Sequence, residues 1–172
     1  KNLEKTLEKT TDSDDTIKDL TGIQAFTALK YLNCSFNSLD TLDVSQNTAL
    51  LELDCSSNFG QIPFGPWTPP HNGITGLDLS QNTQLENLNC SFNKLNNLDL
   101  SNNTALITLN CSYNHIEGGV VVEPFPPFPP TGDMGITSLD LSQNTLLQYL
   151  NCKGNCIDTL DLKNNIALAD LI

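Results

Sequence analysis

Apolar and polar positions recur along this chain at fixed steps. One unit, Leu-x-x-Leu-x-Cys-x-x-Asn, has its second leucine at Leu32, Leu53, Leu88, Leu109 and Leu150. A second unit, Leu-Asp-Leu-x-x-Asn with one Val variant, alternates with it and begins at Leu42, Leu77, Leu98, Leu139 and Leu160. Uninterrupted copies lie 21 residues apart. A period of this length predicts a solenoid, in which each turn contacts only its neighbours.

Each unit predicts a short strand, because alternate residues are apolar over Leu-x-Cys and over Leu-Asp-Leu. Stacking the turns places equivalent strands side by side in the same direction. We therefore expect a right-handed coil of short parallel β-strands, arranged in two parallel sheets with few helices.

Five of the six cysteines occupy the same inward position of the first unit: Cys34, Cys55, Cys90, Cys111 and Cys152. Stacked at about 4.8 Å, their side chains point the same way, which suits packing better than disulfide geometry. We expect them to be reduced and buried as small apolar groups. Cys156 stands at a different position, and we expect it to contact solvent.

Two polar columns have structural explanations. The asparagine that ends each unit satisfies backbone groups at a corner, where the chain turns and loses its ladder partners. The aspartates of the second unit stack on the outer side, and we expect them to bond local backbone and keep the surface soluble. Attraction of cations or of a basic partner is the alternative for these carboxylates.

The repeats are preceded by a cap and broken twice. Leu3 and Leu7 are spaced as on one face of a helix, so residues 1–16 are predicted to form an N-terminal helical cap, followed by the repeat domain at 17–172. Insertions at 59–73 and 115–135 contain all nine prolines of the chain. Long insertions of this kind are usually functional or disordered.

Charge excludes several functions. The formal charge is −12, with eight lysines and no arginine, which argues against binding nucleic acid and anionic membranes. No apolar run is long enough for a membrane span. Nothing brings a nucleophile, a base and an orienting group together, and no Cys/His spacing suggests a metal, so we expect neither an enzyme nor a cofactor.

The units Leu88–Leu95 and Leu98–Thr104 resemble the 21-residue bacterial subclass of leucine-rich repeats, with the consensus LxxLxLxxNxLxxLDLxxN. The segments Leu20–Ile23 and Leu29–Leu32 are similar to the first turns of internalin-like surface proteins. This resemblance implies a leucine-rich repeat solenoid, located outside the cell or on its surface, that binds proteins or glycans.

The candidate binding residues are aromatic. They are Phe59, Phe64, Trp67, Phe125 and Phe128 in the insertions, and Tyr31, Phe92, Tyr113 and Tyr149 on the first strand and its corner. Our leading hypothesis is a non-enzymatic recognition module that binds a protein through the insertions and the adjoining sheet face. The alternatives are a glycan-binding module, in which Trp67 stacks on sugar rings, and a structural spacer of a larger surface protein.

Overall fold

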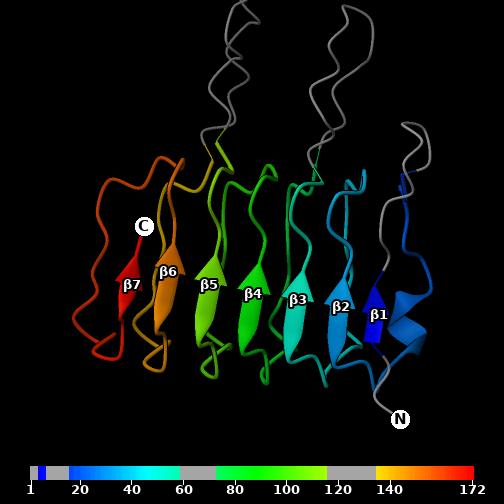
Figure 1. Cartoon of the computed structure of the whole chain (residues 1–172), viewed down its shortest axis with the longest axis horizontal. Helices are drawn as coiled ribbons and strands as arrows, with labels where there is room; N and C mark the ends of the chain where they lie inside the picture. The colour runs from blue at the N-terminus through cyan, green and yellow to red at the C-terminus, as the bar shows by residue number, and fades with distance from the viewer. Residues whose placement is uncertain (1–3, 7–15, 59–72, 116–134) are drawn as a thin grey trace, which may run out of the picture.

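The structure, a computed structural model, describes residues 4–6, 16–58, 73–115 and 135–172. The chain forms one parallel sheet in which the strands lie in the order of the sequence (Figure 1). The strands are β1 (Glu4–Thr6), β2 (Tyr31–Asn33), β3 (Glu52–Asp54), β4 (Asn87–Asn89), β5 (Thr108–Asn110), β6 (Tyr149–Asn151) and β7 (Asp170–Leu171). One 3-10 helix, η1 (Ile23–Ala25), precedes β2.

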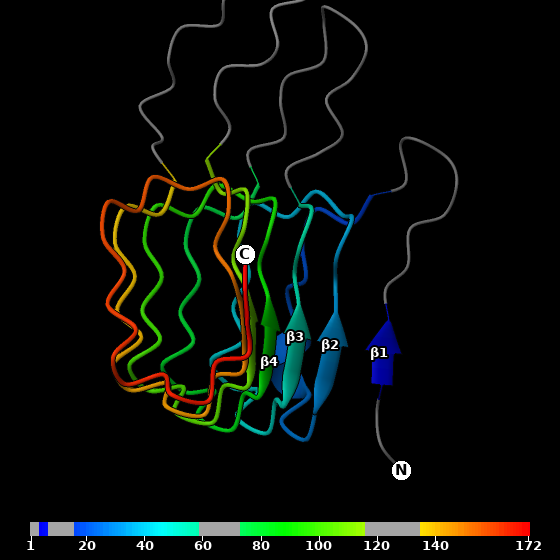
Figure 2. The same cartoon turned by 60° about the vertical axis from the view of Figure 1, so that its left-hand side comes forward.

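The register follows the repeat. Leu32 of β2 pairs with Leu53 of β3, and the equivalent leucines continue this column through β7. In β2, β4, β5 and β6 the central leucine is buried between two half-buried residues. Figure 2 shows each turn rising through the sheet and returning on the opposite side of the coil. The predicted leucine-rich repeat solenoid is therefore confirmed.

The second predicted sheet does not form. The Leu-Asp-Leu segments contain no strand in the described part of the chain, although their apolar residues are buried as expected in all but the last turn, where Leu160 and Leu162 are half-buried. The carbonyl of Val44 accepts hydrogen bonds from the backbone N–H of Asn47 (3.0 Å) and from Nδ2 of Asn82 (3.1 Å). Later turns repeat these bonds. These carbonyls accept hydrogen bonds from the turn and from an asparagine amide. They therefore do not form the backbone hydrogen bonds of a second parallel sheet.

The N-terminal helix prediction is wrong for residues 4–6. These residues form β1, which pairs with β2 in parallel from Glu4–Tyr31 to Thr6–Asn33. The open edge of β2 offers unpaired backbone groups, and pairing with them stabilises an extended segment more than an isolated short helix would be stabilised. The rest of the predicted cap, apart from Thr16, lies outside the described residues.

The core is one continuous cluster of stacked columns, mostly of leucine, and the cysteine ladder is one of these columns. Cys34, Cys55, Cys90 and Cys111 are fully buried and form no disulfide, as predicted. Cys152 is only half-buried, because the short strand β7 is the last one beyond it. Burial raises the pKa of Cys34 and Cys111 to about 12, and it also raises the pKa of Cys55 and Cys90 well above the ordinary value.

Two asparagine ladders hold the corners, as predicted. In the first, Asn93 donates from Nδ2 to the carbonyls of Cys55 (2.9 Å) and Cys90 (3.2 Å), and its Oδ1 accepts from the N–H of Ile74 (3.2 Å). The second ladder donates in the same way, but its buried Oδ1 atoms have no described partner; it comprises Asn47, Asn82, Asn103, Asn144 and Asn165. Each ladder bonds one turn to the next.

We expect a thiol reagent to modify Cys156 and Cys152 in the native protein and to leave the other four thiols unreacted. Both residues are half-buried, and Cys152 should react more slowly because burial raises its pKa. Spectrophotometric counting of modified thiols with and without denaturant measures this difference. Rapid reaction of three or more thiols without denaturant would contradict the buried ladder.

Candidate binding face

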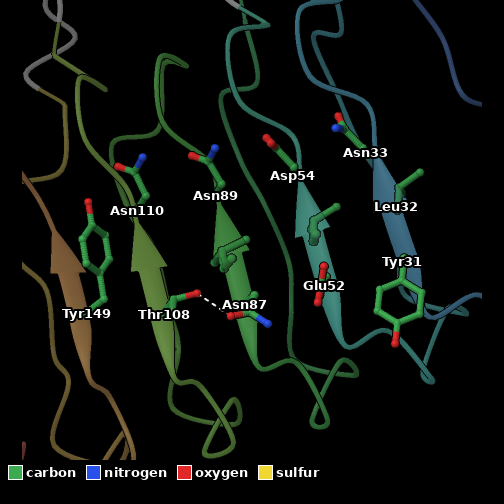
Figure 3. A pocket seen from close by; sticks show the side chains of 12 residues that line it. Tyr31, Leu32, Asn33, Glu52, Asp54, Asn87, Asn89, Thr108, Asn110 and Tyr149 are labelled. Atoms are coloured by element: carbon green, nitrogen blue, oxygen red, sulfur yellow. Dashed lines mark hydrogen bonds between the residues drawn. The ribbon is translucent and has the colours of Figure 1, made fainter. Parts of the chain in front are cut away.

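The sheet face that points away from the core is hollowed into a groove of about 650 Å³ across β2 to β6 (Figure 3). Its lining is polar apart from Leu32, Leu53, Leu88 and two tyrosines. The side chains that line it are those of Tyr31, Asn33, Glu52, Asp54, Asn87, Asn89, Thr108, Asn110 and Tyr149. Figure 3 shows Tyr31 and Tyr149 at opposite ends of the groove.

The side chains at the C-terminal ends of these strands are held by local hydrogen bonds. Oδ1 of Asp54 accepts from both the backbone N–H (3.0 Å) and Oγ (2.7 Å) of Ser56. Asn33, Asn89 and Asn110 make the same pair of bonds with the serine two residues later. Since these rotamers are fixed by two bonds each, the groove wall is preorganised for a ligand.

Negative charge in the groove comes from a single turn. Glu52 is exposed at the first position of β3 and Asp54 is half-buried at its last position. The equivalent lining residues on β2, β4, β5 and β6 are Tyr, Asn or Thr, and no lysine lines the groove among the described side chains. At the centre, Thr108 Oγ1 donates to Asn87 Oδ1 at 2.6 Å.

Beyond the C-terminal end of each strand, one residue turns the chain with a left-handed backbone. This corner column consists of Phe36, Ser57, Phe92, Tyr113 and Gly154, with φ between 53° and 67°. The left-handed region is uncommon for residues other than glycine and is strained for bulky ones. Gly154 adopts it freely, and a Cβ there would lie 2.6 Å from Cδ1 of Tyr113.

Two rings of the corner column stack on each other. The centroids of Phe92 and Tyr113 are 4.7 Å apart, with 16° between the ring planes. Nζ of Lys153 lies 5.9 Å from the centroid of Tyr113, within the range of a cation–π contact. The corner column therefore displays aromatic surface along one edge of the groove face.

Comparison with solved structures gives the same architecture. The functional domain of InlJ from Listeria monocytogenes, described as including a cysteine ladder, has 35% sequence identity and a TM-score of 0.70 over 91% of this chain. The chain is an internalin-like leucine-rich repeat protein. It spans 27% of the InlJ chain. Internalin C2 from the same bacterium shares the fold, with 22% identity and a TM-score of 0.50 over 91% of this chain and 66% of that one.

No family model matches the chain, and no curated protein matches it. The internalin-like assignment thus rests on the solenoid, the cysteine ladder and the solved InlJ domain. In the described residues, no helix is long and apolar enough to cross a membrane. The same residues contain no cluster of three or more His, Cys, Asp or Glu side chains able to hold a metal ion.

The aspartate column of the internalin-like repeat makes local bonds, as predicted. The N–H of Ser45 donates to Oδ1 of Asp43 (3.0 Å), and this bond holds the pKa of the exposed carboxyl below its ordinary value. The pKa values of Asp78, Asp99 and Asp140 are lowered for the same reason. For Asp161 the hydrogen bond from Lys163 Nζ (2.7 Å) contributes first. These carboxylates cap tight turns opposite the groove.

The structure separates the sequence-predicted site residues into two groups. Tyr31 and Tyr149 line the groove, whereas Phe92 and Tyr113 belong to the corner column. The insertion residues Phe59, Phe64, Trp67, Phe125 and Phe128 lie outside the described residues. A column of serines that follows the strands is buried, and each of its hydroxyls bonds the Asn or Asp two residues earlier: Ser35, Ser56, Ser91 and Ser112.

Two groups of site residues were absent from the sequence-based selection. Glu52 and Asp54 are the charged side chains of the groove, and Phe36 extends the corner column. The signal for them is present in the repeat alignment, where Glu52 and Asp54 replace neutral residues at equivalent positions. Selecting aromatic residues alone missed this departure from the repeat.

Proposed function

We propose that this chain is a non-enzymatic, exported recognition module that binds a protein partner on the groove face, together with the adjoining insertions at 59–73 and 115–135. The observation that carries this proposal is the groove itself. It crosses five strands, its polar side chains are fixed by local hydrogen bonds, and aromatic rings stand at both ends. Tyrosines beside fixed polar groups are typical anchors of protein interfaces.

A binding role fits the groove better than catalysis. Thr108 donates its hydroxyl proton to the Asn87 amide, which cannot act as a base. Oδ1 of Asp54 accepts two hydrogen bonds from Ser56, which holds this carboxylate in place. The lining therefore offers hydrogen-bonding and stacking groups without an activated nucleophile.

The placement of the insertions supports their part in the interface. They follow Asn58 and Asn114, which end the turns of β3 and β5, on the edge that carries the corner column. At the base of the second insertion, a Cβ on Gly135 would lie 2.6 Å from Cβ of His115, so the two ends of this segment meet. The support for export is the likeness to internalins.

We expect replacement of the groove tyrosines to abolish partner binding. The immobilised protein would be used to capture its partner from the native environment, and the affinity of the isolated partner would be measured for Tyr31→Ala and Tyr149→Ala. Each change should weaken binding at least about tenfold, equivalent to about 1.4 kcal/mol, because an aromatic anchor at one end of the groove is removed. Leu146→Ala is the control, since Leu146 is exposed on the turn that leads into β6 but does not line the groove.

Two deletions test the insertions without disturbing the repeat. Removing 59–72 joins Asn58 to Gly73, and removing 115–134 joins Asn114 to Gly135, which restores the regular five-residue step to the next leucine. Loss of the partner in either deletion assigns that insertion to the interface. Unchanged binding in both tyrosine variants and both deletions would refute the proposal, and glycan-array binding that requires Trp67 would favour the sugar-binding alternative.

A further inference from the structure

The corner column lacks one ring. Phe36, Phe92 and Tyr113 carry aromatic side chains on the turns of β2, β4 and β5, but the turn of β3 carries Ser57. Its backbone is equivalent, with φ of 55° against 56° for Phe36 and 53° for Phe92. The N–H groups of Phe36, Ser57 and Phe92 bond the serine carbonyl of the next turn at 2.9–3.0 Å, so the column is continuous through Ser57.

The missing ring leaves a space of defined size. Neighbouring strands lie about 4.8 Å apart, so Phe36 and Phe92 are separated by roughly 10 Å across the turn of Ser57. The adjacent pair, Phe92 and Tyr113, stacks with centroids 4.7 Å apart. A ring placed midway between Phe36 and Phe92 would stack on each of them at about the same centroid distance. The space therefore has room for one planar ring. We call this space, bounded by Phe36, Ser57 and Phe92, the ring slot.

The two aromatic residues that bound the ring slot are open to solvent, and Ser57 between them is half-buried. Phe36 is 59% exposed and Phe92 is 45% exposed, although both are large apolar side chains held in a strained backbone conformation. At the equivalent position of the last turn, Gly154 adopts the same conformation without strain. The turn itself does not require an aromatic residue, because glycine forms it without strain. Exposed aromatic side chains in a strained backbone conformation therefore indicate that the rings have a function at the surface.

The charged turn of the groove leads directly into the ring slot. Glu52, Asp54 and Ser57 belong to the same turn, and Asp54 precedes Ser57 by three residues. At about 3.3 Å per extended residue, the carboxylate and the slot are within roughly 10 Å of each other. The negative charge of Asp54 therefore lies near the position where the ring is missing, and Glu52 lies two residues earlier on the same strand.

Three of the hydrogen-bonding groups beside the ring slot are already engaged, which leaves the hydroxyl of Ser57 as the polar side chain of the slot itself. Oγ of Ser56 donates to Asp54, Oγ of Ser91 donates to Asn89, and the N–H of Ser57 donates to the carbonyl of Ser91. A sugar ring needs partners for its hydroxyl groups, and burying them unpaired is costly. A flat apolar ring has no such requirement and gains stacking with Phe36 and Phe92.

We infer that the ring slot binds an aromatic side chain of a protein partner, in a segment that also places a lysine or arginine against Glu52 and Asp54. The inference rests on the proposed protein-binding function and specifies the chemistry of the partner. The aromatic ring stacks between Phe36 and Phe92 over Ser57. The neighbouring cation pairs with the carboxylates at the adjoining end of the groove, which carries no positive charge of its own.

A synthetic peptide tests this directly. It contains two lysines and, two residues later, one tryptophan, separated by glycines, and its binding is followed by calorimetry and by the amide NMR shifts of Phe36, Ser57 and Phe92. Replacing its tryptophan with leucine or its lysines with glutamates should each reduce the affinity at least about tenfold. Saturable shifts at the three slot residues are expected with the parent peptide alone.

Three variants of the chain locate the peptide. Ser57→Phe fills the slot with the residue that the equivalent turns carry at Phe36 and Phe92, so the fold tolerates it, and binding should fall at least about tenfold. Phe36→Ala removes one wall and should also weaken binding. The double change Glu52→Gln with Asp54→Asn should lower the affinity about fivefold and reduce its salt dependence. Asp99→Asn, on the opposite side of the coil, is the neutralisation control and should bind normally.

Several results would overturn the inference. These are equal binding of the leucine peptide, unchanged binding by Ser57→Phe, and binding of a disaccharide such as lactose at the slot residues in place of the peptide. Tighter peptide binding after removal of 59–72 would assign the slot to the chain's own segment and not to a partner. If the native partner requires Tyr149 but binds Ser57→Phe normally, the groove function stands and the ring slot is excluded from it.

Discussion

Raising the pH from 8 to 11 is expected to unfold the repeat domain. Burial raises the pKa of Cys34 and Cys111 to about 12 and raises that of Cys55 and Cys90 well above the ordinary value, whereas a thiol in the unfolded chain titrates near 8.5. Above the unfolded value, the unfolded chain loses these protons and the folded chain keeps them. Stability is therefore complete below about pH 8.5 and falls as the pH rises toward the folded pKa values.

The expected loss is large because four thiols act together. Each thiol that is protonated in the folded state and ionised in the unfolded state contributes about 1.4 kcal/mol per pH unit. Four of them amount to roughly 5 kcal/mol per pH unit, or on the order of 10 kcal/mol by pH 11. A domain of this size is usually stable by about 5–15 kcal/mol, so the loss is comparable to the whole free energy of unfolding.

Urea unfolding measured by circular dichroism at pH 8, 9 and 10, with a reductant present, gives the slope. Cys90→Ala should reduce the slope by about a quarter, since one of the four buried thiols is removed. Cys156→Ala should leave it unchanged, because Cys156 is half-buried and outside the ladder. A free energy of unfolding that does not change between pH 8 and pH 10 would show that the ladder thiols are not protonated and buried as described.

Replacing Asn93 with alanine is expected to lower the free energy of unfolding by about 2–4 kcal/mol. Its fully buried amide donates to Cys55, Cys90 and Ser91 at 2.9–3.2 Å and accepts from Ile74 at 3.2 Å. Without it, the N–H of Ile74 has no acceptor inside a dry corner, and the carbonyl of Cys55 loses a donor. Unpaired buried groups cost more than the hydrogen bonds themselves contribute.

Two comparison variants make the effect specific. Asn96→Ala, at an exposed position of the same turn, should change stability by less than about 0.5 kcal/mol. Asn103→Ala should lower the free energy of unfolding by an amount between those of the other two variants. Asn103 donates two hydrogen bonds, but its Oδ1 has no partner among the described residues. Chemical denaturation of all three variants measures the order. Equal destabilisation by Asn93→Ala and Asn96→Ala would contradict the structural role of the ladder.

Repetition made the candidate face partly predictable. Tyr31 and Tyr149 occupy the same outward position of the unit, so the alternation of a strand places both on the groove face, where the structure has them. Glu52 and Asp54 were not selected, because their importance depends on the neutral residues beside them on β2 and β4. The ring slot depends on the left-handed backbone of the corner column and on the spacing of its rings. Neither can be predicted from the sequence of the repeat unit.

The sequence by itself determined the solenoid, the buried leucine and cysteine columns and the asparagine corners. These features follow from a fixed period, which brings each residue against its own copy whatever the details of the turn. Only the tertiary structure decided the number of sheets, the path of residues 4–6 and the backbone of the corner column. In each case the outcome depends on which partner takes a backbone hydrogen bond. Asn82 donates a hydrogen bond to the carbonyl of Val44, so this carbonyl does not join a second sheet. The edge of β2 pairs with residues 4–6, so these residues form a strand. That competition occurs between segments distant in the chain, so local periodicity carries no information about it.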